Sequence, residues 1–311
     1  MKDTVITVVV PYKNRAAYLP DTLRSIVEQP FRPLTVILVD NGSDDHSPDI
    51  CREFAAQHAA DPRLNIRLAA EPKPGAAAAR NRGLDLCDTE FVYFFDSDDW
   101  FDSDFLTSVF PHLNAGLDLL AVPTRMVVGG REQVRAFFTT SRPEVQVLCS
   151  HLSTQSMVFR TSFLRRIGGW NEHAFIWDDW ELGVRALCRS PRMEWAAGRA
   201  FHRVLVHPDS ITGTDYTSRL PFIIATLDQL LGLADGGNLQ RALFLRSSIV
   251  YGVLHREAST SALTDFSAFI KRSFKHMSFP DRLMGRLLSA YVAWGGRGAW
   301  RMAMEWLEWR H

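Results

Sequence analysis

The segment Phe91-Val-Tyr-Phe-Phe-Asp-Ser-Asp-Asp-Trp100 is the most informative feature of this sequence. Its apolar and aromatic first half is typical of a buried β-strand, and the carboxylates of Asp96, Asp98 and Asp99 follow directly. A strand that ends in Asp-x-Asp brings oxygen ligands to the edge of a sheet, where they suit a hard divalent cation. The alternative reading is a solvated acidic turn that caps a helix starting near Asp102.

Strands and helices alternate through the first third of the chain. Apolar runs predict strands over 4–10, 34–39, 65–69 and 91–95, and helical periodicity predicts helices over 15–28, from Ser47-Pro48 onward, and over 75–86. Such alternation indicates an α/β fold, with a parallel sheet and right-handed crossovers. Ligands bind outside the carboxyl ends of such strands. The polar residues at those ends, 11–15, 40–45 and 96–99, are therefore the candidates for a site.

The rest of the chain divides into a mixed and a helical part. Between 117 and 206 short strands and helices are expected, with a strand predicted over Glu144–Leu148. Helical periodicity fills the chain after Tyr216, over 217–234, 239–257, 262–277 and 280–309. We therefore place a boundary near residue 213. This gives a domain over 1–213, with halves over 1–100 and 101–213, and a helical region over 214–311.

Composition narrows the class of protein. The chain has 311 residues, of which 46% are hydrophobic, so it can bury a core. Lys plus Arg and Asp plus Glu number 35 each, so no net charge favours nucleic acid. The four cysteines are scattered without metal-binding spacing. The N-terminus does not resemble a signal peptide, and no long apolar segment indicates a membrane span. We expect a cytoplasmic protein.

Sequence motifs follow the predicted strand ends in a recognisable order. They are Val9–Asn14, Val39–Asp44, Gly75–Gly83, Phe95–Asp99, Arg166–Trp170 with Trp177–Leu182, and Val206–Ile211. In this order and spacing, over residues 4–212, the chain resembles a family 2 glycosyltransferase. The resemblance implies the GT-A fold, a Rossmann-like and mostly parallel sheet flanked by helices. Residues 1–100 would then form the nucleotide-binding half, 101–213 the acceptor half, and 214–311 a helical C-terminal subdomain.

The resemblance also implies roles for individual residues. Asp40 would hydrogen-bond the base of the donor, commonly uracil. The remaining donor and metal residues would be Pro11, Tyr12 and Asn14 lining the nucleotide pocket, Arg80 reaching the nucleotide or its phosphates, Asp96 contacting ribose or sugar, and Asp98 and His207 binding Mn²⁺ or Mg²⁺. Structural alternatives stay open, because Asp40 suits a turn, Arg80 a helix surface and His207 a strand end.

The pair Asp178-Asp179 is the candidate for the catalytic base. Relatives commonly carry Glu-Asp at this place, and the resemblance assigns the base to Asp179. Repulsion between adjacent carboxylates raises a pKa, whereas a helix N-terminus lowers it, so the direction of the shift stays open. Trp177 and Trp180 would either wall the site as a stacking surface for a sugar or belong to the core.

The activity implied by the resemblance is inverting, metal-dependent transfer of a sugar from a nucleotide sugar, with a UDP-sugar expected. The acceptor would be a hydroxyl of a glycan or of a lipid-linked molecule. A nucleotidyltransferase is the enzyme alternative, but that class needs a glycine-rich loop where this chain has Pro11-Tyr-Lys-Asn-Arg15. A catalytically degenerate sugar-nucleotide-binding protein is the other alternative.

The C-terminal segment 271–311 has a distinctive composition. It carries eight Lys or Arg against three Asp or Glu, a net charge of +5, together with Trp294, Trp300, Trp306 and Trp309. Basic residues interleaved with tryptophan and leucine are typical of a helix lying on anionic lipid. This hypothesis would place the protein at the inner face of the membrane. The alternative is a helical subdomain that packs on the catalytic domain or on the partner in a homodimer.

Overall fold

The computed structural model describes residues 5–196, 199–206, 216–234, 236–257 and 260–309. The predicted boundary near 213 and the predicted metal ligand His207 lie outside these residues. The strands are β1 (Ile6–Tyr12), β2 (Leu34–Asp40), β3 (Leu64–Ala70), β4 (Phe91–Phe94), β5 (Leu119–Ala121), β6 (Thr124–Val128), β7 (Arg131–Val134), β8 (Met157–Arg160), β9 (Met193–Trp195) and β10 (Phe201–Val206). The helices are α1 (Leu19–Val27), α2 (Ser47–Gln57), α3 (Ala76–Leu86), α4 (Phe105–Val109), α5 (Pro143–Cys149), α6 (Thr161–Arg166), α7 (Asp178–Leu187), α8 (Leu220–Leu231), α9 (Gly237–Glu257), α10 (Thr260–Ser273), α11 (Phe279–Ala293) and α12 (Ala299–Trp309).

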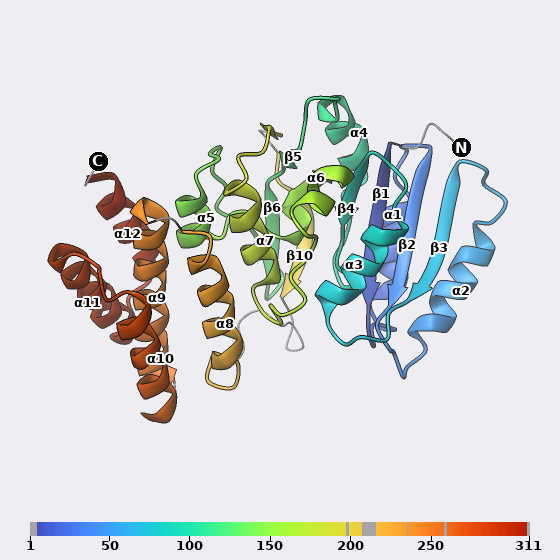
Figure 1. Ribbon diagram of the computed structural model, residues 1–311. Helices are drawn as coiled ribbons and strands as arrows, with labels where there is room; N and C mark the ends of the chain where they lie inside the picture. Colours follow the sequence, from blue (N-terminus) through green and yellow to red (C-terminus); the bar gives the residue numbers. More distant parts are fainter. Residues whose placement is uncertain (1–4, 197–198, 207–215, 235, 258–259, 310–311) are drawn as a thin grey trace.

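A seven-stranded sheet forms the centre of the fold, in the order β3-β2-β1-β4-β8-β5-β9 (Figure 1). β1 pairs in parallel with both β2 and β4, and β8 runs antiparallel between β4 and β5. The first crossovers leave β1 toward β2 and β3, and β4 then returns to the other side of β1. The strand order thus reverses beside β1, which is where ligands bind in open α/β sheets. This confirms the predicted mostly parallel sheet.

Both faces of this sheet are covered, because alternate residues of each strand point to opposite sides. Val8 and Val10 of β1 pack with apolar residues of α1, α2 and α4, whereas Val9 packs with α3, α6 and α7. The α3 side is unusually close. A Cβ built on Gly83 would lie 2.2 Å from a methyl group of Val9, so only glycine lets α3 approach β1 this tightly.

The predicted strand over Glu144–Leu148 is wrong, since these residues form helix α5. Val145, Gln146, Val147 and Leu148 are all buried, because α5 lies against α7 and α9. A short apolar run is compatible with a buried strand or a buried helix, and periodicity alone does not separate them. Pro143 in the first turn was the available signal for a helix.

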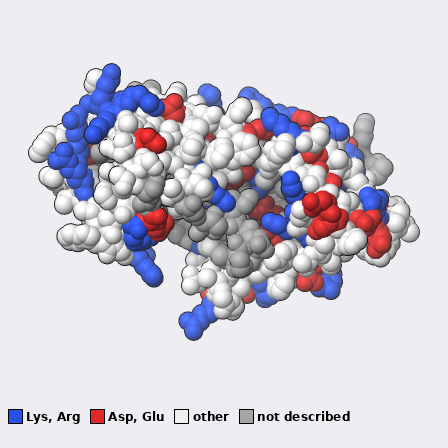
Figure 2. Space-filling model, turned by 90° about the horizontal axis from the view of Figure 1, so that it is seen from below, with Lys and Arg blue, Asp and Glu red and all other residues white. Residues whose placement is uncertain are grey.

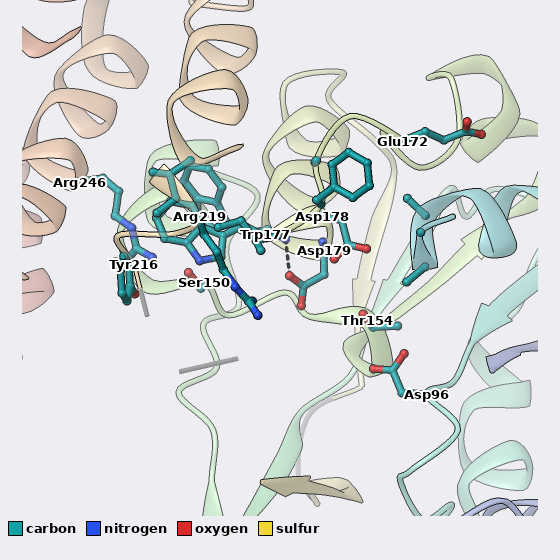
Figure 3. A pocket seen from close by; sticks show the side chains of 18 of the residues that line it. Asp96, Ser150, Thr154, Glu172, Trp177, Asp178, Asp179, Tyr216, Arg219 and Arg246 are labelled. Carbon is teal, nitrogen blue, oxygen red and sulfur yellow. Dashed lines mark hydrogen bonds between the residues drawn. The ribbon is translucent and has the colours of Figure 1, made fainter. Parts of the chain in front are cut away.

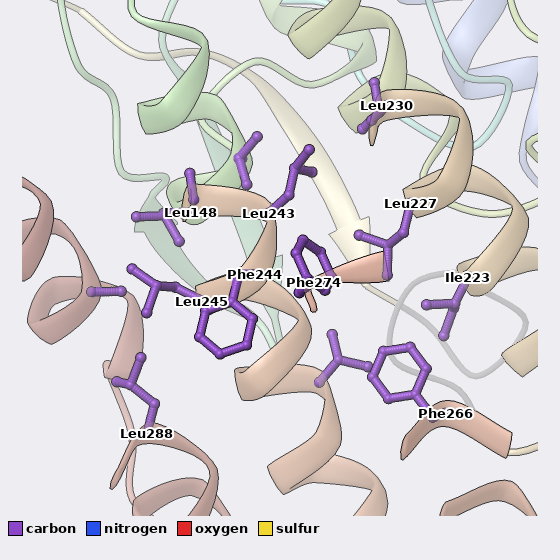
Figure 4. Close-up of a cluster of buried hydrophobic side chains, with 14 of the residues drawn as sticks. Leu148, Ile223, Leu227, Leu230, Leu243, Phe244, Leu245, Phe266, Phe274 and Leu288 are labelled. Carbon is purple, nitrogen blue, oxygen red and sulfur yellow. The ribbon is translucent and has the colours of Figure 1, made fainter. Parts of the chain in front are cut away.

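The C-terminal helices share a hydrophobic core with the acceptor half of the sheet domain. Leu148 of α5 and Trp180 and Val184 of α7 pack in one cluster with Ile223 of α8 and Leu243 of α9 (Figure 4). The C-terminal helices therefore pack against α5 and α7 of the sheet domain. None of the described helices is long and apolar enough to cross a bilayer.

Within this subdomain α9 and α11 approach each other closely. A Cβ on Gly252 would lie 2.5 Å from the backbone oxygen of Ser289, and one on Gly285 would lie 2.7 Å from the ring of Phe244. Small residues at both crossing points let the helix backbones come together. Gly295 and Gly298, both with positive φ, end this pair of helices and turn the chain into α12.

Candidate active site

The carboxylates that follow β4 point in different directions. Asp96 accepts hydrogen bonds from Arg80 at 2.8 Å and from the side-chain amide of Gln155 at 2.7 Å. Asp99 is buried, and accepts from the same Gln155 amide and from the backbone N–H of Leu205 at 2.8 Å. Burial, with Asp96 and Asp98 nearby, raises the pKa of Asp99 well above its usual range. Asp99 is thus a buried structural partner of Gln155 and Leu205.

Asp98 lies in the wall of a cavity at the carboxyl ends of the strands, with a volume of about 540 Å³. We call it the strand-end cavity. Its lining is Pro11, Tyr12, Lys13, Asn14, Arg15, Asn41, Gly75, Ala76, Ala79, Asp96, Ser97, Asp98, Asp99, Val204 and Leu205. The predicted residues Pro11, Tyr12, Asn14, Asp96 and Asp98, distant in sequence, are therefore brought together. Arg15 Nε lies 3.3 Å from the Asp98 carboxylate.

Asp40 lies beside this cavity but does not line it. Its carboxylate accepts the backbone N–H of Ser43 at 3.0 Å and so holds the turn after β2. The neighbouring Asn41 does line the cavity and accepts the N–H of Gly75 at 2.8 Å, at the start of α3. Sequence reasoning picked out this turn but passed over Asn41, which joins the β2 turn to α3.

A second cavity, of about 440 Å³, opens where α7 begins, and we call it the α7 cavity (Figure 3). Gly75, Ala76 and Asp96 line both cavities, so the two adjoin. The α7 cavity is also lined by Arg135, Ser150, Thr154, Glu172, Trp177, Asp178, Asp179, Trp180, Tyr216, Arg219 and Arg246, among others. Asp179 therefore faces a space that connects with the one that Asp98 faces.

Trp177 turns the chain sharply into α7. Its φ of 60° is in the left-handed region, which a bulky side chain rarely adopts. This backbone conformation directs Asp178 and Asp179 into the first turn, and such strain is concentrated at functional sites. Trp177 and Trp180 pack edge to face with ring centroids 5.3 Å apart. Trp180 is buried and donates its indole N–H to Gln146 O at 3.0 Å, so it belongs to the core while lining the cavity.

Arg80 connects the two halves of the site from beneath. It is only 5% exposed, and its guanidinium donates to Asp96 at 2.8 Å and to Asp178 at 2.5 Å. Burial disfavours its charge, but Asp178 and Asp96 outweigh that effect and raise the pKa of Arg80. The guanidinium also stacks 4.4 Å from the ring of Trp170. Arg80 is therefore no surface residue, and it lines neither cavity.

The two adjacent aspartates of α7 differ in their surroundings. Asp178 is ion-paired with Arg80, whereas no Lys or Arg nitrogen of the described residues lies within ion-pairing distance of Asp179. Burial, and then the charge of Asp178, raise the pKa of Asp179, although Arg135, Arg80 and the N–H of Trp180 act in the opposite direction. The pKa of Asp179, whose direction of shift the sequence left open, is therefore raised. Asp179 is the carboxylate that is suited to accept a proton.

Several lining residues escaped sequence reasoning. Arg135, Tyr216, Arg219 and Arg246 come from the loop after β7 and from the C-terminal region. The one available signal was Arg246, a charged residue inside an apolar helical run of α9. Gln155, which holds Asp96 and Asp99 together, had no local signal, because its role depends on a contact 56 to 59 residues away.

Comparison with known proteins agrees with this geometry. The profile described as "Glycosyl transferase family 2" matches residues 7–171. Glycosyltransferase GlyA of Streptococcus pneumoniae is 37% identical over 108 residues, which is 35% of this chain and 15% of GlyA. The chain thus matches only a small part of the length of that relative. Since the profile covers more than half of the chain, the chain belongs to the family 2 glycosyltransferases, a family of enzymes.

Solved structures agree on the fold. S. aureus TarS 1-349 in complex with UDP-GlcNAc superposes with a TM-score of 0.68 at 18% identity, over 97% of this chain and 91% of that one. The mannosyltransferase PcManGT from Pyrobaculum calidifontis, in complex with GDP-Man and Mn²⁺, gives a TM-score of 0.56 at 18% identity, over 97% of this chain and 87% of the other. The predicted GT-A fold with its C-terminal helices is confirmed.

The ion pairs of Arg80 yield a prediction about stability. Arg80→Gln leaves the half-buried carboxylates of Asp96 and Asp178 without their shared cation, so the free energy of unfolding falls by about 1–3 kcal/mol. Arg80→Lys keeps the charge but cannot donate to both carboxylates with the same geometry. Its stability therefore lies between those of the native chain and Arg80→Gln. Urea unfolding measures both. Arg82→Gln, on the exposed side of α3, is the matched control and changes stability by less than about 0.5 kcal/mol. Equal stability of Arg80→Gln and the native chain would contradict the bridge.

Proposed function

We propose that this protein is an inverting glycosyltransferase that moves a sugar from a nucleoside diphosphate sugar, with a UDP-sugar as donor, to a hydroxyl of a glycan or lipid-linked acceptor. The observation that carries the proposal is the junction of the two cavities at Asp96. The strand-end cavity would hold the nucleotide, and the α7 cavity would hold the acceptor. Family membership favours this reaction over nucleotidyl transfer, and UDP-GlcNAc in the TarS structure supports the donor class.

In this proposal Asp179 is the general base. It takes the proton from the acceptor hydroxyl as that oxygen attacks the anomeric carbon, opposite the leaving diphosphate. Arg80 pairs with Asp178, whereas burial and the neighbouring charge of Asp178 raise the pKa of Asp179 and so its affinity for a proton. A positioned base contributes a factor of about 10² to 10⁴ in rate. Asp40 and Asn41 beside the nucleotide, and Pro11, Tyr12 and Asn14 in the wall, would fix the donor.

The side chains of the strand-end cavity fit a divalent cation that is also bound by the diphosphate of the nucleotide sugar. In the described part of the chain no three His, Cys, Asp or Glu side chains converge on one point. Asp98, however, presents a carboxylate to the strand-end cavity, and Mg²⁺ usually takes one or two carboxylates together with phosphate oxygens. Asp98 would thus hold Mn²⁺ or Mg²⁺, and His207 remains the proposed second ligand. When bound, the cation supplies Lewis-acid stabilisation of the diphosphate.

Replacement of Asp179 tests the base. Asp179→Asn keeps the size of the side chain but cannot accept the proton, so transfer falls by about 10²-fold or more, while calorimetry finds UDP binding unchanged. Asp85→Asn, an exposed carboxylate on α3, is the matched control and retains activity. The base must be ionised to act, so the rate of the native enzyme declines as the pH falls through the pKa of Asp179. Because that pKa is raised, the decline occurs above the ordinary pKa of aspartate, about 3.9. Near-normal turnover of Asp179→Asn would remove this assignment.

Metal removal tests Asp98. A chelator abolishes transfer by the native chain, and Mn²⁺ restores it. Asp98→Ala binds UDP more weakly and gains little from Mn²⁺, because the carboxylate that holds the cation is gone. Asp44→Asn, an exposed carboxylate at the same edge of the sheet, responds to Mn²⁺ like the native chain. Chelator-resistant transfer by the native chain would show that the reaction needs no cation at this place.

We further propose that α11 contacts an anionic lipid surface, which would bring the enzyme to a lipid-linked acceptor. The inner face of α11 packs on α9, yet its outer face is apolar as well. Phe279, Leu283, Leu287, Tyr291 and Trp294 are exposed at helical spacing, with Trp294 at 90%. A groove beside this stripe is lined by Lys271, Lys275, Arg282 and Arg286, among others. Figure 2 shows basic side chains gathered at the end of the molecule that the C-terminal helices form. Exposed apolar side chains beside basic ones suit anionic headgroups.

Flotation with vesicles tests this contact. The full chain floats with vesicles that contain phosphatidylglycerol and not with phosphatidylcholine alone. The double variant Leu287→Ser, Trp294→Ser stays in the soluble fraction, because the apolar stripe is interrupted. Val134→Ser, an equally exposed apolar residue on β7, floats like the native chain. If the native chain ignores both vesicles but sediments as a dimer that the double variant cannot form, the stripe is instead a homodimer contact.

A further inference from the structure

The α7 cavity is divided by charge. Its carboxylates, Asp96, Asp178 and Asp179, lie together toward the sheet, and Arg219, Tyr216 and Arg246 lie at the opposite end (Figure 3). The acidic end is largely compensated, since Arg80 pairs with Asp96 and Asp178. Glu172, in the same wall, pairs with Lys73. Among the described residues no carboxylate pairs with Arg246, so the cavity offers a base at one end and positive charge at the other.

Arg246 is the decisive residue at that end. Its guanidinium packs 5.1 Å from the ring centre of Trp177 and 5.7 Å from that of Trp180. Its Nε is buried without a hydrogen-bond partner, and no carboxylate of the described residues pairs with it. Burial lowers the pKa of Arg246, although Tyr216 and Cys149 act in the opposite direction. A buried cation without a counter-ion is costly, and aromatic rings compensate it only in part.

Arg135 supplies a second positive charge from a different part of the chain. It lies just after β7, lines the same cavity, and donates to the backbone oxygen of Ser150 at 3.3 Å. In the described residues no carboxylate forms an ion pair with it. Arg219, at the start of α8, also lines this wall. Three separate segments thus place a guanidinium around one space, which is a geometry that suits an oxyanion.

The diphosphate of the donor does not account for this charge. None of Arg135, Arg219 and Arg246 lines the strand-end cavity, where Asp98 and the residues after β1 would hold the nucleotide. The two cavities share only Gly75, Ala76 and Asp96. In Figure 3, Arg219 and Arg246 lie beyond Asp179 as seen from Asp96. An anion bound there would belong to the molecule that brings the attacking hydroxyl.

We infer that the acceptor is anionic, and that a phosphate ester or carboxylate of the acceptor binds between Arg246 and Arg135 while its hydroxyl reaches Asp179. This inference rests on the proposed function, since it identifies the chemical class of the acceptor of the same site. It also gives Arg246 a counter-ion that the described residues do not provide. A neutral sugar acceptor would offer Arg246 no negative charge.

Ligand-observed NMR titration of the full chain in the presence of UDP tests the inference. The probes are glycerol 3-phosphate and glucuronate, with glycerol and glucose as their neutral counterparts. Binding of either anion in preference to its neutral counterpart supports the inference, and the comparison of the two anions tells phosphate from carboxylate. Arg246→Gln weakens anion binding by about tenfold or more, because a charge-assisted hydrogen bond is lost. Arg246→Lys recovers part of it, and UDP affinity stays within about twofold.

Two further variants keep the test decisive. Arg256→Gln, an exposed arginine further along α9, is the matched control and binds the anion like the native chain. Arg135→Gln changes a half-buried side chain away from the core, and it also weakens binding of the anion. It therefore tests the inference even if Arg246→Gln fails to fold. The inference is overturned if the neutral and anionic probes bind with equal affinity. It is also overturned if Arg246→Gln and Arg135→Gln weaken the binding of UDP as much as they weaken the binding of the anion. Failure of the native chain to bind UDP would instead count against the proposed function.

Discussion

The bridge from Arg80 to Asp96 and Asp178 is the interaction on which the rest of the site depends. Asp96 ends the first βαβ half of the sheet, and Asp178 begins α7 in the second half, so the bridge joins segments 82 residues apart. Without a buried cation these carboxylates would repel each other where the two cavities meet. With it, Asp178 is held in an ion pair, whereas no Lys or Arg of the described residues pairs with Asp179. A single helix residue thus sets both the closeness of the halves and the difference between two neighbouring aspartates.

Much of the first half could be predicted because its signals are local. Apolar runs separated by helical periodicity indicate parallel strands, and the carboxyl ends of parallel strands share one edge of a sheet. That argument alone places Pro11, Asn14, Asp96 and Asp98 near one another, and the structure brings them to one cavity. The pair Asp178-Asp179 was picked out by its motif and the family resemblance, and it begins α7.

What escaped prediction depends on contacts between distant segments. Arg80 was expected at the nucleotide, yet its guanidinium is turned inward by carboxylates that the sequence does not show to be near. The run Glu144–Leu148 became a helix because α7 and α9 bury it on both sides, which its own periodicity cannot reveal. Arg246 lines the site only because α9 packs across α5, and no motif connects it to Asp179. Tertiary context decided each of these outcomes.

The close crossing of α9 and α11 at Gly252 and Gly285 makes these two helices a stiff arm. Arg246 lies on the same α9 that carries this crossing, near the mouth of the α7 cavity. A contact that immobilises α11 therefore also fixes the position of α9 and of Arg246 in the wall of the α7 cavity. If the proposed membrane contact of α11 holds, the packing of α9 on α11 sets how far the α7 cavity, and an acceptor hydroxyl within it, lies from the lipid surface.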